Sequence, residues 1–369
     1  MFVERFVAWA SHACVAERAD ALKVMAQRYS DRDIAADDIP GTEQVFTLFL
    51  DDPSPIVRAA MAEALAGCEF LPRTLVWSLS RDIPEVAAAM LRASPLLGVN
   101  ALVHAARDGD PVCQAAVAAR DDIDAKTVRT LVAFGAPEAA VALLQNDQVL
   151  LSPDLKHDLA KRLASDAAVR DVLLDDETIL PQTRQILVHG LACSLVNFAS
   201  SHFCVEEARL RSVANRAASL GSVELADGTD AKAMADYVAH LRETDQLTPT
   251  LLLRAVCEGR LALFEAAMAQ LSGVSLRRVR STAKASHSSA FRSLHTRAGL
   301  SDTTFSVFQA AIAMVHTGLT GNDLILAIVD RVEEEGSADP ALLSMLYQIA
   351  ADNRRHQARN FDRQKLLAA

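Results

Sequence analysis

Apolar residues in the first half of the chain recur as short helical stripes, and each stripe begins at a proline. In residues 51–67, DDPSPIVRAAMAEALAG, Ser54 followed by Pro55 predicts the start of a helix. The apolar residues that follow at helical spacing are Val57, Met61, Ala64 and Leu65. The same pattern returns at intervals of 29, 27 and 26 residues, at Pro84, Pro111 and Pro137.

A second apolar segment follows each of the first three prolines, so each interval holds a pair of helices. These segments are residues 70–80, 94–106 and 124–135, and they are rich in Leu, Val and Ala. A pair of short helices cannot bury its apolar surface alone and is stabilised by stacking on the next pair. We therefore predict an α-solenoid over residues 1–180.

The first repeat resembles a known class of helical repeat. The residues that carry the resemblance are Asp52, Pro55, Val57, Arg58, Ala59, Ala60 and Leu65, which match the D-x-x-P-x-V-R-x-A-A pattern of short HEAT-like repeats. Such repeats are linked by a ladder of Asp and Arg side chains. Because Arg58 is replaced by Ala87, Gln114 and Ala140 in the later repeats, the sequence supports this ladder in the first repeat only.

Residues 181–369 are helical without this spacing. In residues 247–281, Thr248 with Pro249 predicts a helix start. Gly259 and Gly273 predict the ends of two short helices, and Ser275 predicts the start of a third. The chain is thus predicted to be all-α, with a HEAT-like solenoid over residues 1–180 followed by a compact helical domain over residues 181–369.

The same stretch resembles a second, more specific family. The residues that carry this resemblance are Leu252, Arg254, Gly259, Phe264, Glu265, Ala266, Ala267, Leu271, Gly273, Val274 and Val279. They are similar to the distinctive segment of an uncharacterised alphaproteobacterial helical family, a domain of unknown function, over most of residues 45–300. The resemblance implies a helical fold and a bacterial cytoplasmic setting, and it implies no activity.

The net charge of −10 is unevenly distributed along the chain. Residues 1–180 contain 17 Lys and Arg against 28 Asp and Glu, a net charge of −11. The remaining residues contain 20 against 19, a net charge of +1. An acidic first half repels nucleic acid, so we expect no nucleic-acid partner for the protein as a whole.

Two uncharged runs, residues 185–205 and 303–322, are long enough to span a membrane. Both contain polar side chains: His189, Asn197, His202, Gln309 and His316. We therefore expect buried core helices and no membrane span. The six cysteines are scattered without paired spacing, which predicts reduced, mostly buried thiols and a cytoplasmic location.

The main candidate for a binding surface lies between Glu265 and Asp302, an interval without acidic residues. We call its six cations the basic stripe, residues 276–297: Arg277, Arg278, Arg280, Lys284, Arg292 and Arg297. On a helix, Arg277, Arg280 and Lys284 fall within an arc of about 60°. The opposite side is apolar, with Leu276, Val279 and Ala283.

Two interpretations of the basic stripe are open. One is a site for an acidic partner surface or a phosphate-bearing ligand, assisted by the backbone amides of the turn formed by Ser286, His287, Ser288 and Ser289, with His295 nearby. The other is a solvated face that balances the acidic first half.

A metal site is a further hypothesis, because His189 and Cys193 are four residues apart and His202 and Cys204 follow. On one continuous helix, His202 points away from His189, and Cys204 lies about 22 Å along the axis. These residues are therefore predicted to pack in the core, and we predict no metal. No phosphate-binding loop, hydrolase or dinucleotide motif is present, so we predict no cofactor either.

With no catalytic motif, the sequence favours a non-enzymatic scaffold or adaptor in bacterial regulation, which binds an acidic protein partner through the basic stripe. One alternative is an enzyme on a HEAT-like scaffold, such as a DNA glycosylase or a bilin lyase. A glycosylase needs a basic concave face and an acid beside an aromatic such as Trp9 or Trp77. Another alternative is a sensor whose second half binds a phosphorylated small molecule.

Overall fold

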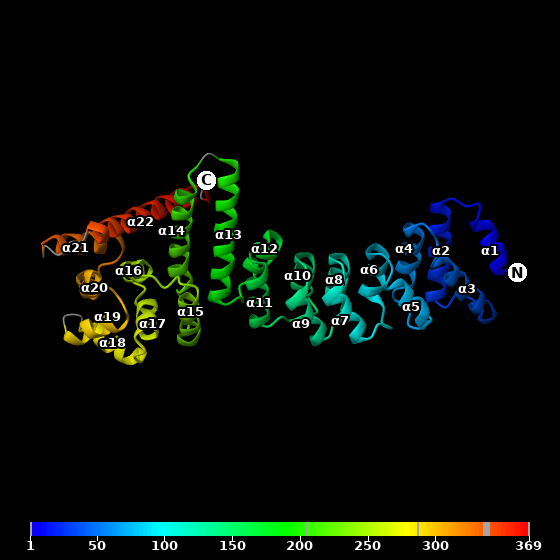
Figure 1. The fold of residues 1–369 in the computed structure, drawn as a ribbon, viewed down its shortest axis with the longest axis horizontal. Coiled ribbons are helices and arrows are strands. Elements are labelled where there is room, and N and C mark those ends of the chain that lie inside the picture. The colour runs from blue at the N-terminus through cyan, green and yellow to red at the C-terminus, as the bar shows by residue number, and fades with distance from the viewer. Residues whose placement is uncertain (1, 204, 286–287, 335–339, 368–369) are drawn as a thin grey trace. The chain divides into compact units, whose positions relative to one another are not determined.

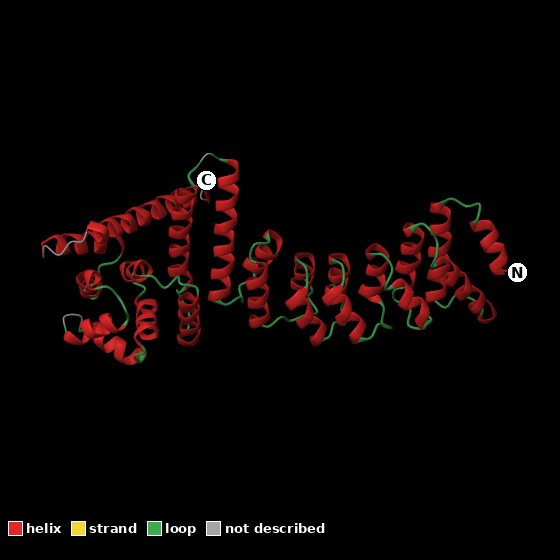
Figure 2. Ribbon diagram, viewed as in Figure 1, coloured by secondary structure: helices red, strands yellow, loops and turns green. Residues whose placement is uncertain are grey.

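The computed structural model describes residues 2–203, 205–285, 288–334 and 340–367, and these residues form helices with no strand among them (Figure 2). The chain divides into two compact units, Met1–Ile179 and Leu180–Ala369. The all-α fold class expected from the sequence is confirmed.

Short helices make up the first unit (Figure 1). They are α1 (Phe2–Ala10), α2 (Val15–Ser30), α3 (Ile39–Phe49), α4 (Pro55–Leu65), α5 (Arg73–Leu79), α6 (Pro84–Ala93), α7 (Val99–Asp108), α8 (Pro111–Ala118), α9 (Ala125–Phe134), α10 (Pro137–Leu144), α11 (Pro153–Leu163) and α12 (Ala167–Asp175), with a 3₁₀ turn, η1 (Ala36–Asp38), before α3.

These helices pack in two rows. In one row α2, α4, α6, α8, α10 and α12 each lie against the next, and in the other α7, α9 and α11 do the same. The buried residues of the first row repeat at the same helical position, as with Val57 of α4 and Val86 of α6. The apolar stripe of each helix is thus covered by its neighbours in the row.

The four prolines that predict helix starts each occupy the first residue of a helix, in α4, α6, α8 and α10. Proline fits this position because its missing N–H has no partner in the first turn. Ser54 stands at the N-cap of α4 as expected, although its side chain accepts no capping bond. Asp110 does cap α8, since its carboxylate accepts from the backbone N–H of Val112.

Ion pairs between neighbouring repeats extend further than the sequence indicated. Arg18 of α2 donates to Asp52, with 2.9 Å between Nε and Oδ2. Arg58 of α4 donates both to the backbone carbonyl of Asp52 and to the Asp82 carboxylate before α6. A ladder from α2 to α6 therefore exists, and it includes a step before the first recognisable repeat.

The ladder ends where Ala87 replaces the arginine, and an amide continues the linkage further along. Gln114 of α8 donates to the carbonyl of Ala106 in α7 and accepts from the backbone N–H of Ala136 before α10. Because a side-chain amide is both donor and acceptor, it joins two neighbouring repeats without a charge.

The second unit contains the longer helices. They are α13 (Pro181–His202), α14 (Glu207–Leu225), α15 (Ala231–Glu243), α16 (Pro249–Cys257), α17 (Leu261–Ser272), α18 (Leu276–Lys284), α19 (Ser289–Arg297), α20 (Asp302–Val315), α21 (Gly321–Glu334) and α22 (Pro340–Leu367).

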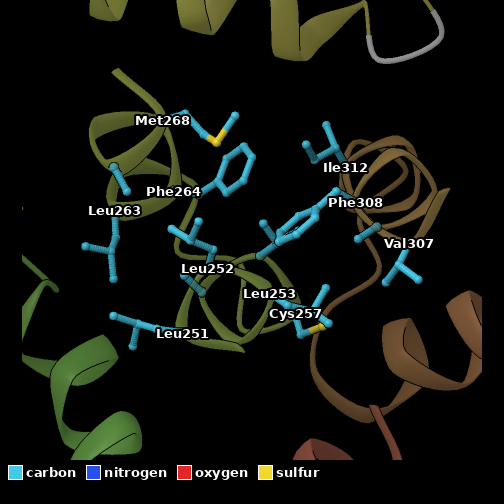
Figure 3. Close-up of a cluster of buried hydrophobic side chains, with 14 of the residues drawn as sticks. Leu251, Leu252, Leu253, Cys257, Leu263, Phe264, Met268, Val307, Phe308 and Ile312 are labelled. Carbon is cyan, nitrogen blue, oxygen red and sulfur yellow. The ribbon is translucent and has the colours of Figure 1, made fainter. Parts of the chain in front are cut away.

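The core of the second unit is built around α16, whose residues 251–257 are all buried. It packs against α14, α17, α20 and α21. Figure 3 shows Leu252 and Leu253 of α16 beside Phe264 of α17 and Phe308 of α20. The rings of Phe264 and Phe308 stack with their centroids 5.8 Å apart. A helix that is apolar all round is stable only when other helices cover every side of it.

Local signals place the ends of these helices. Thr248 caps α16 by accepting from the backbone N–H of Leu251. Gly259 and Gly273 have φ values of +75° and +66°, a left-handed conformation that favours glycine, and they follow α16 and α17 as predicted. Ser275 precedes α18, but its side chain makes no capping bond.

The expectation of two buried core helices is correct for residues 303–315, whereas residues 316–320 form an exposed turn. It is only partly correct for residues 185–205, where Leu187 and Val196 are buried but much of the helix is exposed. The first run forms α20, which buries Phe305, Phe308 and Ile312. The second forms most of α13, where Leu195 and Phe198 are 58% and 55% exposed. Among the described residues, no helix combines the length and apolar character needed to cross a membrane.

The first prediction tests the stacking of the repeats. Val57 is completely buried, so Val57→Asp places an unpaired carboxylate between helices and is expected to lower the free energy of unfolding by about 3–4 kcal/mol. Its neighbour Ile56 is 63% exposed, and Ile56→Asp is the matched control, with an expected change within about 0.5 kcal/mol. Equal unfolding midpoints for the two variants in urea would contradict the packing described here.

The second prediction concerns the ladder and pH. The hydrogen bond from Arg58 outweighs partial burial and lowers the pKa of Asp82 below its usual range. A lowered pKa means that the ion pair stabilises the fold above the unfolded-state pKa of about 3.9 and that this stability is lost as pH falls through the folded-state pKa. Asp82→Asn is therefore expected to cost about 1 kcal/mol at pH 7, and the difference from wild type should shrink below pH 4.

The control for this prediction is Asp33→Asn, which removes the carboxylate of the exposed Arg28–Asp33 pair. An exposed pair contributes little, so the change at pH 7 should stay within about 0.5 kcal/mol. If Asp82→Asn and Asp33→Asn have the same effect in urea unfolding at pH 7, the ladder does not stabilise the repeats.

Candidate functional site

The basic stripe lies on α18 and α19, and its six cations are exposed. The opposite face of α18 is packed as the pattern predicted, since Val279 and Ala283 are buried and Leu276 is half-buried. A buried apolar face and an exposed charged face give α18 its orientation.

Three of the six cations are held by their own chain. Arg280 pairs with Glu265 of α17, with 2.8 Å between Nε and Oε2. Arg297 donates to the carbonyl of Ser272 at the end of α17, at 2.7 Å. The guanidinium of Arg292 lies 4.3 Å from the ring centroid of Phe305. These contacts attach α18 and α19 to α17 and α20.

The other three cations are Arg277, Arg278 and Lys284. Within the part of the chain that the structure describes, their side chains make no hydrogen bond, ion pair or ring contact. They point their charges into solvent, where an acidic surface can reach them without breaking an existing contact.

His295, the described histidine near the stripe, does not join this surface. His295 is buried between Phe305 and Phe308, and its Nε2 lies 3.1 Å from Oγ1 of Thr304. Burial lowers the pKa of His295, so its side chain is neutral at pH 7 and unsuited to bind an anion. His287 and Ser286, expected to assist anion binding, lie outside the described residues.

The proposed metal ligands are on the surface. His189 and Cys193 are exposed, so the prediction that they pack in the core is wrong, and their Nε2 and Sγ atoms lie 3.6 Å apart. His202 stacks on Phe198 with 4.3 Å between ring centroids. Cys204 lies outside the described residues. The described residues contain no group of three or more His, Cys, Asp or Glu side chains placed to hold a metal ion.

Two of the buried cysteines, Cys113 and Cys257, are unsuited to nucleophilic chemistry. Cys68, Cys113 and Cys257 are buried, whereas Cys14 and Cys193 are exposed. Burial raises the pKa of Cys257 to about 12 and also raises that of Cys113, so both thiols stay protonated at pH 7.

The two tryptophans, Trp9 and Trp77, lie in different environments. Trp9 packs beside Phe6, with 5.3 Å between ring centroids. Trp77 is exposed, and the guanidinium of Arg81 lies 3.9 Å above its ring. Asp82 lines the same groove as Trp77, but Arg58 already binds its carboxylate. Asp82 is therefore held by Arg58, and Asp108 and Asp110 line the same groove.

A cavity that the sequence did not indicate lies in the second unit. Its volume is about 610 Å³, and it is lined mainly by α14, α16 and the segment 245–248 between α15 and α16. Three arginines line it: Arg211, Arg216 and Arg254. The sequence contains one signal that could have indicated this cavity: Arg254 is the one charged residue within the apolar helix PTLLLRAVC. Arg211 and Arg216 lie in a different helix, and only the tertiary fold brings them to the same cavity.

The fold and these surfaces define an all-helical protein whose candidate sites are cationic. A family described as an uncharacterised protein conserved in bacteria, DUF2336, matches residues 86–341, and the chain belongs to this family. The expected membership of a bacterial family with a domain of unknown function is confirmed. No curated protein and no solved structure matches the chain significantly.

The third prediction concerns metal. The His189–Cys193 pair supplies two ligands, and a stable zinc site needs at least three from the protein. Protein purified without chelator is therefore expected to contain no stoichiometric zinc. Elemental analysis by mass spectrometry tests this, with Cys193→Ser as the matched sample. One zinc per chain in the wild type and none in the variant would show that the site exists.

Proposed function

We propose that this protein is a non-enzymatic helical scaffold that binds an acidic surface of another protein through its basic stripe. The observation that carries the proposal is the set of exposed cations on α18 and α19. Arg277, Arg278 and Lys284 are available for a partner, and the contacts of Arg280, Arg292 and Arg297 fix the two helices that present them.

The first unit supports a scaffold role. Its helices stack in two rows, an arrangement that helical-repeat proteins use to bind other proteins. The Arg18–Asp52 and Arg58–Asp82 pairs occupy the place of the ladder in HEAT-like repeats, so we assign the unit to that class of α-solenoid.

Charge narrows the class of partner. The net charge of −11 over residues 1–180 disfavours a nucleic acid, which a protein binds mainly by neutralising phosphates with Lys and Arg. A protein partner with a local acidic patch is compatible with both the basic stripe and the negatively charged first unit. Its patch contacts the stripe, and the first unit stays in solvent. We place this interaction in the bacterial cytoplasm, in an alphaproteobacterium.

The fourth prediction tests the stripe by charge reversal. Replacing Arg277, Arg278 and Lys284 by Glu should leave the fold intact, because exposed positions typically change stability by no more than about 0.5 kcal/mol each. Arg280 is left in place to keep its pair with Glu265. Quantitative affinity capture from the native host, with wild type and variant compared, should show loss of a partner that also dissociates as salt rises.

The matched control reverses three other exposed cations of the same unit, Arg209, Lys232 and Arg354, and so changes the net charge equally. Circular dichroism should show the same helical content for all three proteins. If the stripe variant retains every partner at wild-type affinity, or if the control variant loses the same partners, the stripe is a solvated face and the proposal fails.

A further inference from the structure

The cavity of the second unit has polar walls that the scaffold function does not use. Arg254 and Leu251 of α16 form one wall, and Ser219 and Ser222 of α14 form another. The segment that begins at Asp245 closes one side. In Figure 1 these elements are α14, α16 and the connection from α15 to α16.

Two buried groups at the cavity lack partners for their hydrogen-bonding atoms. Arg254 is 2% exposed, and its Nη2 donates to Asp352 of α22 at 3.1 Å. Its Nε and Nη1 have no hydrogen-bond partner among the described residues, and neither does the buried Oγ of Ser219. An unpaired buried donor costs free energy, so a ligand that accepts from it recovers that cost.

The ion pair with Asp352 fixes the guanidinium of Arg254 in place. Asp352 is itself buried and also accepts from Arg355 at 3.2 Å. Glu258, one turn along α16, approaches Nη1 at 3.9 Å, which is too long for a hydrogen bond. The side chain is therefore oriented before any ligand binds, and a preorganised group loses less entropy on binding.

The mouth of the cavity adds positive charge. Arg216 is half-buried and makes no hydrogen bond or ion pair with any residue that the structure describes. Arg211 lies one turn earlier on α14 and pairs with the exposed Glu207. Asp245 is the one acidic residue among the lining side chains. Arg254 and Arg211 already pair with Asp352 and Glu207, so Arg216 is the lining arginine whose charge is left for a ligand.

The size and chemistry of the cavity define the class of ligand. A volume of about 610 Å³ falls in the range of small-molecule sites and exceeds what a single inorganic ion fills. Guanidinium groups form strong, charge-assisted hydrogen bonds to phosphate oxygens. Neutral donors and acceptors also line the cavity, among them Asn215, Gln246 and Gln348, and they suit the hydroxyl or ring groups of a larger molecule.

We propose that this cavity binds a phosphate-bearing small molecule of about nucleotide size, with Arg254 and Ser219 at its inner end and Arg216 at its mouth. A phosphate oxygen of the ligand accepts from Nε or Nη1 of Arg254, which lie on different edges of the guanidinium, and a second acceptor satisfies the Ser219 hydroxyl. This site is separate from the basic stripe, and it holds whether or not the stripe binds a protein.

Isothermal titration calorimetry of the full chain with inorganic pyrophosphate tests the proposal, and malonate serves as a dianion without phosphorus. The expected result is one pyrophosphate per chain, bound at least tenfold more tightly than malonate. Arg216→Gln should weaken pyrophosphate binding at least tenfold, because it removes a charge-assisted contact while the half-buried position tolerates a neutral side chain. Ser219→Ala should weaken it several-fold.

The matched control is Arg278→Gln on α18, which removes the same charge from the basic stripe and should leave pyrophosphate affinity unchanged within twofold. The absence of binding heat overturns the proposal, and so does malonate binding as tightly as pyrophosphate. Equal weakening by Arg216→Gln and Arg278→Gln also overturns it, because it indicates diffuse attraction to a cationic surface. Unchanged affinity in Ser219→Ala means that the cavity holds only water at its inner end, which overturns the assignment of that end.

Discussion

The first unit depends on one constraint: most of its helices are too short to be stable alone. Helices α4 to α12 have between 7 and 11 residues, and isolated helices below about 12–15 residues are marginal in water. Each of them gains its stability by burying an apolar stripe against the next helix in the row. The arginine and glutamine side chains that cross between repeats satisfy backbone carbonyls at the helix ends, so they fix the spacing that the apolar stripes leave undetermined.

In the second unit, the helices are stabilised by packing around one central helix, α16. Because α16 is buried on every side, it needs partners all round, and α14, α17, α20 and α21 supply them. This burial gives Arg254 its special position. A charge on such a helix must be paired, and Asp352 of α22 provides the counter-charge. The hydrogen bond to Asp352 uses only Nη2 of the guanidinium. Its Nε and Nη1 lie at the wall of the cavity without a hydrogen-bond partner among the described residues.

Local signals in the sequence predicted the helices well. A proline at a helix start or a glycine with positive φ acts through the backbone of a few neighbouring residues, so Pro55 and Gly273 are readable without the fold. Periodicity also gave the orientation of α18, with Val279 inside. These signals show which face of each helix is apolar, and this information is sufficient to predict the fold class.

The failures concern facts that only tertiary neighbours decide. The apolar run of α13 was expected to be buried, yet Leu195 is exposed. The apolar character of a helix does not determine whether another helix packs against that face. His295 lies beside the basic stripe in the sequence, and Phe305 and Phe308 from α20 enclose it. The pairing of Arg280 with Glu265 has the same origin. Arg280, Arg297 and Arg292 already contact a carboxylate, a backbone carbonyl and an aromatic ring of their own chain. Arg277, Arg278 and Lys284 have no such contact among the described residues. The electrostatic attraction to the acidic surface that we propose is therefore concentrated in those three side chains, although all six cations look equivalent in the sequence.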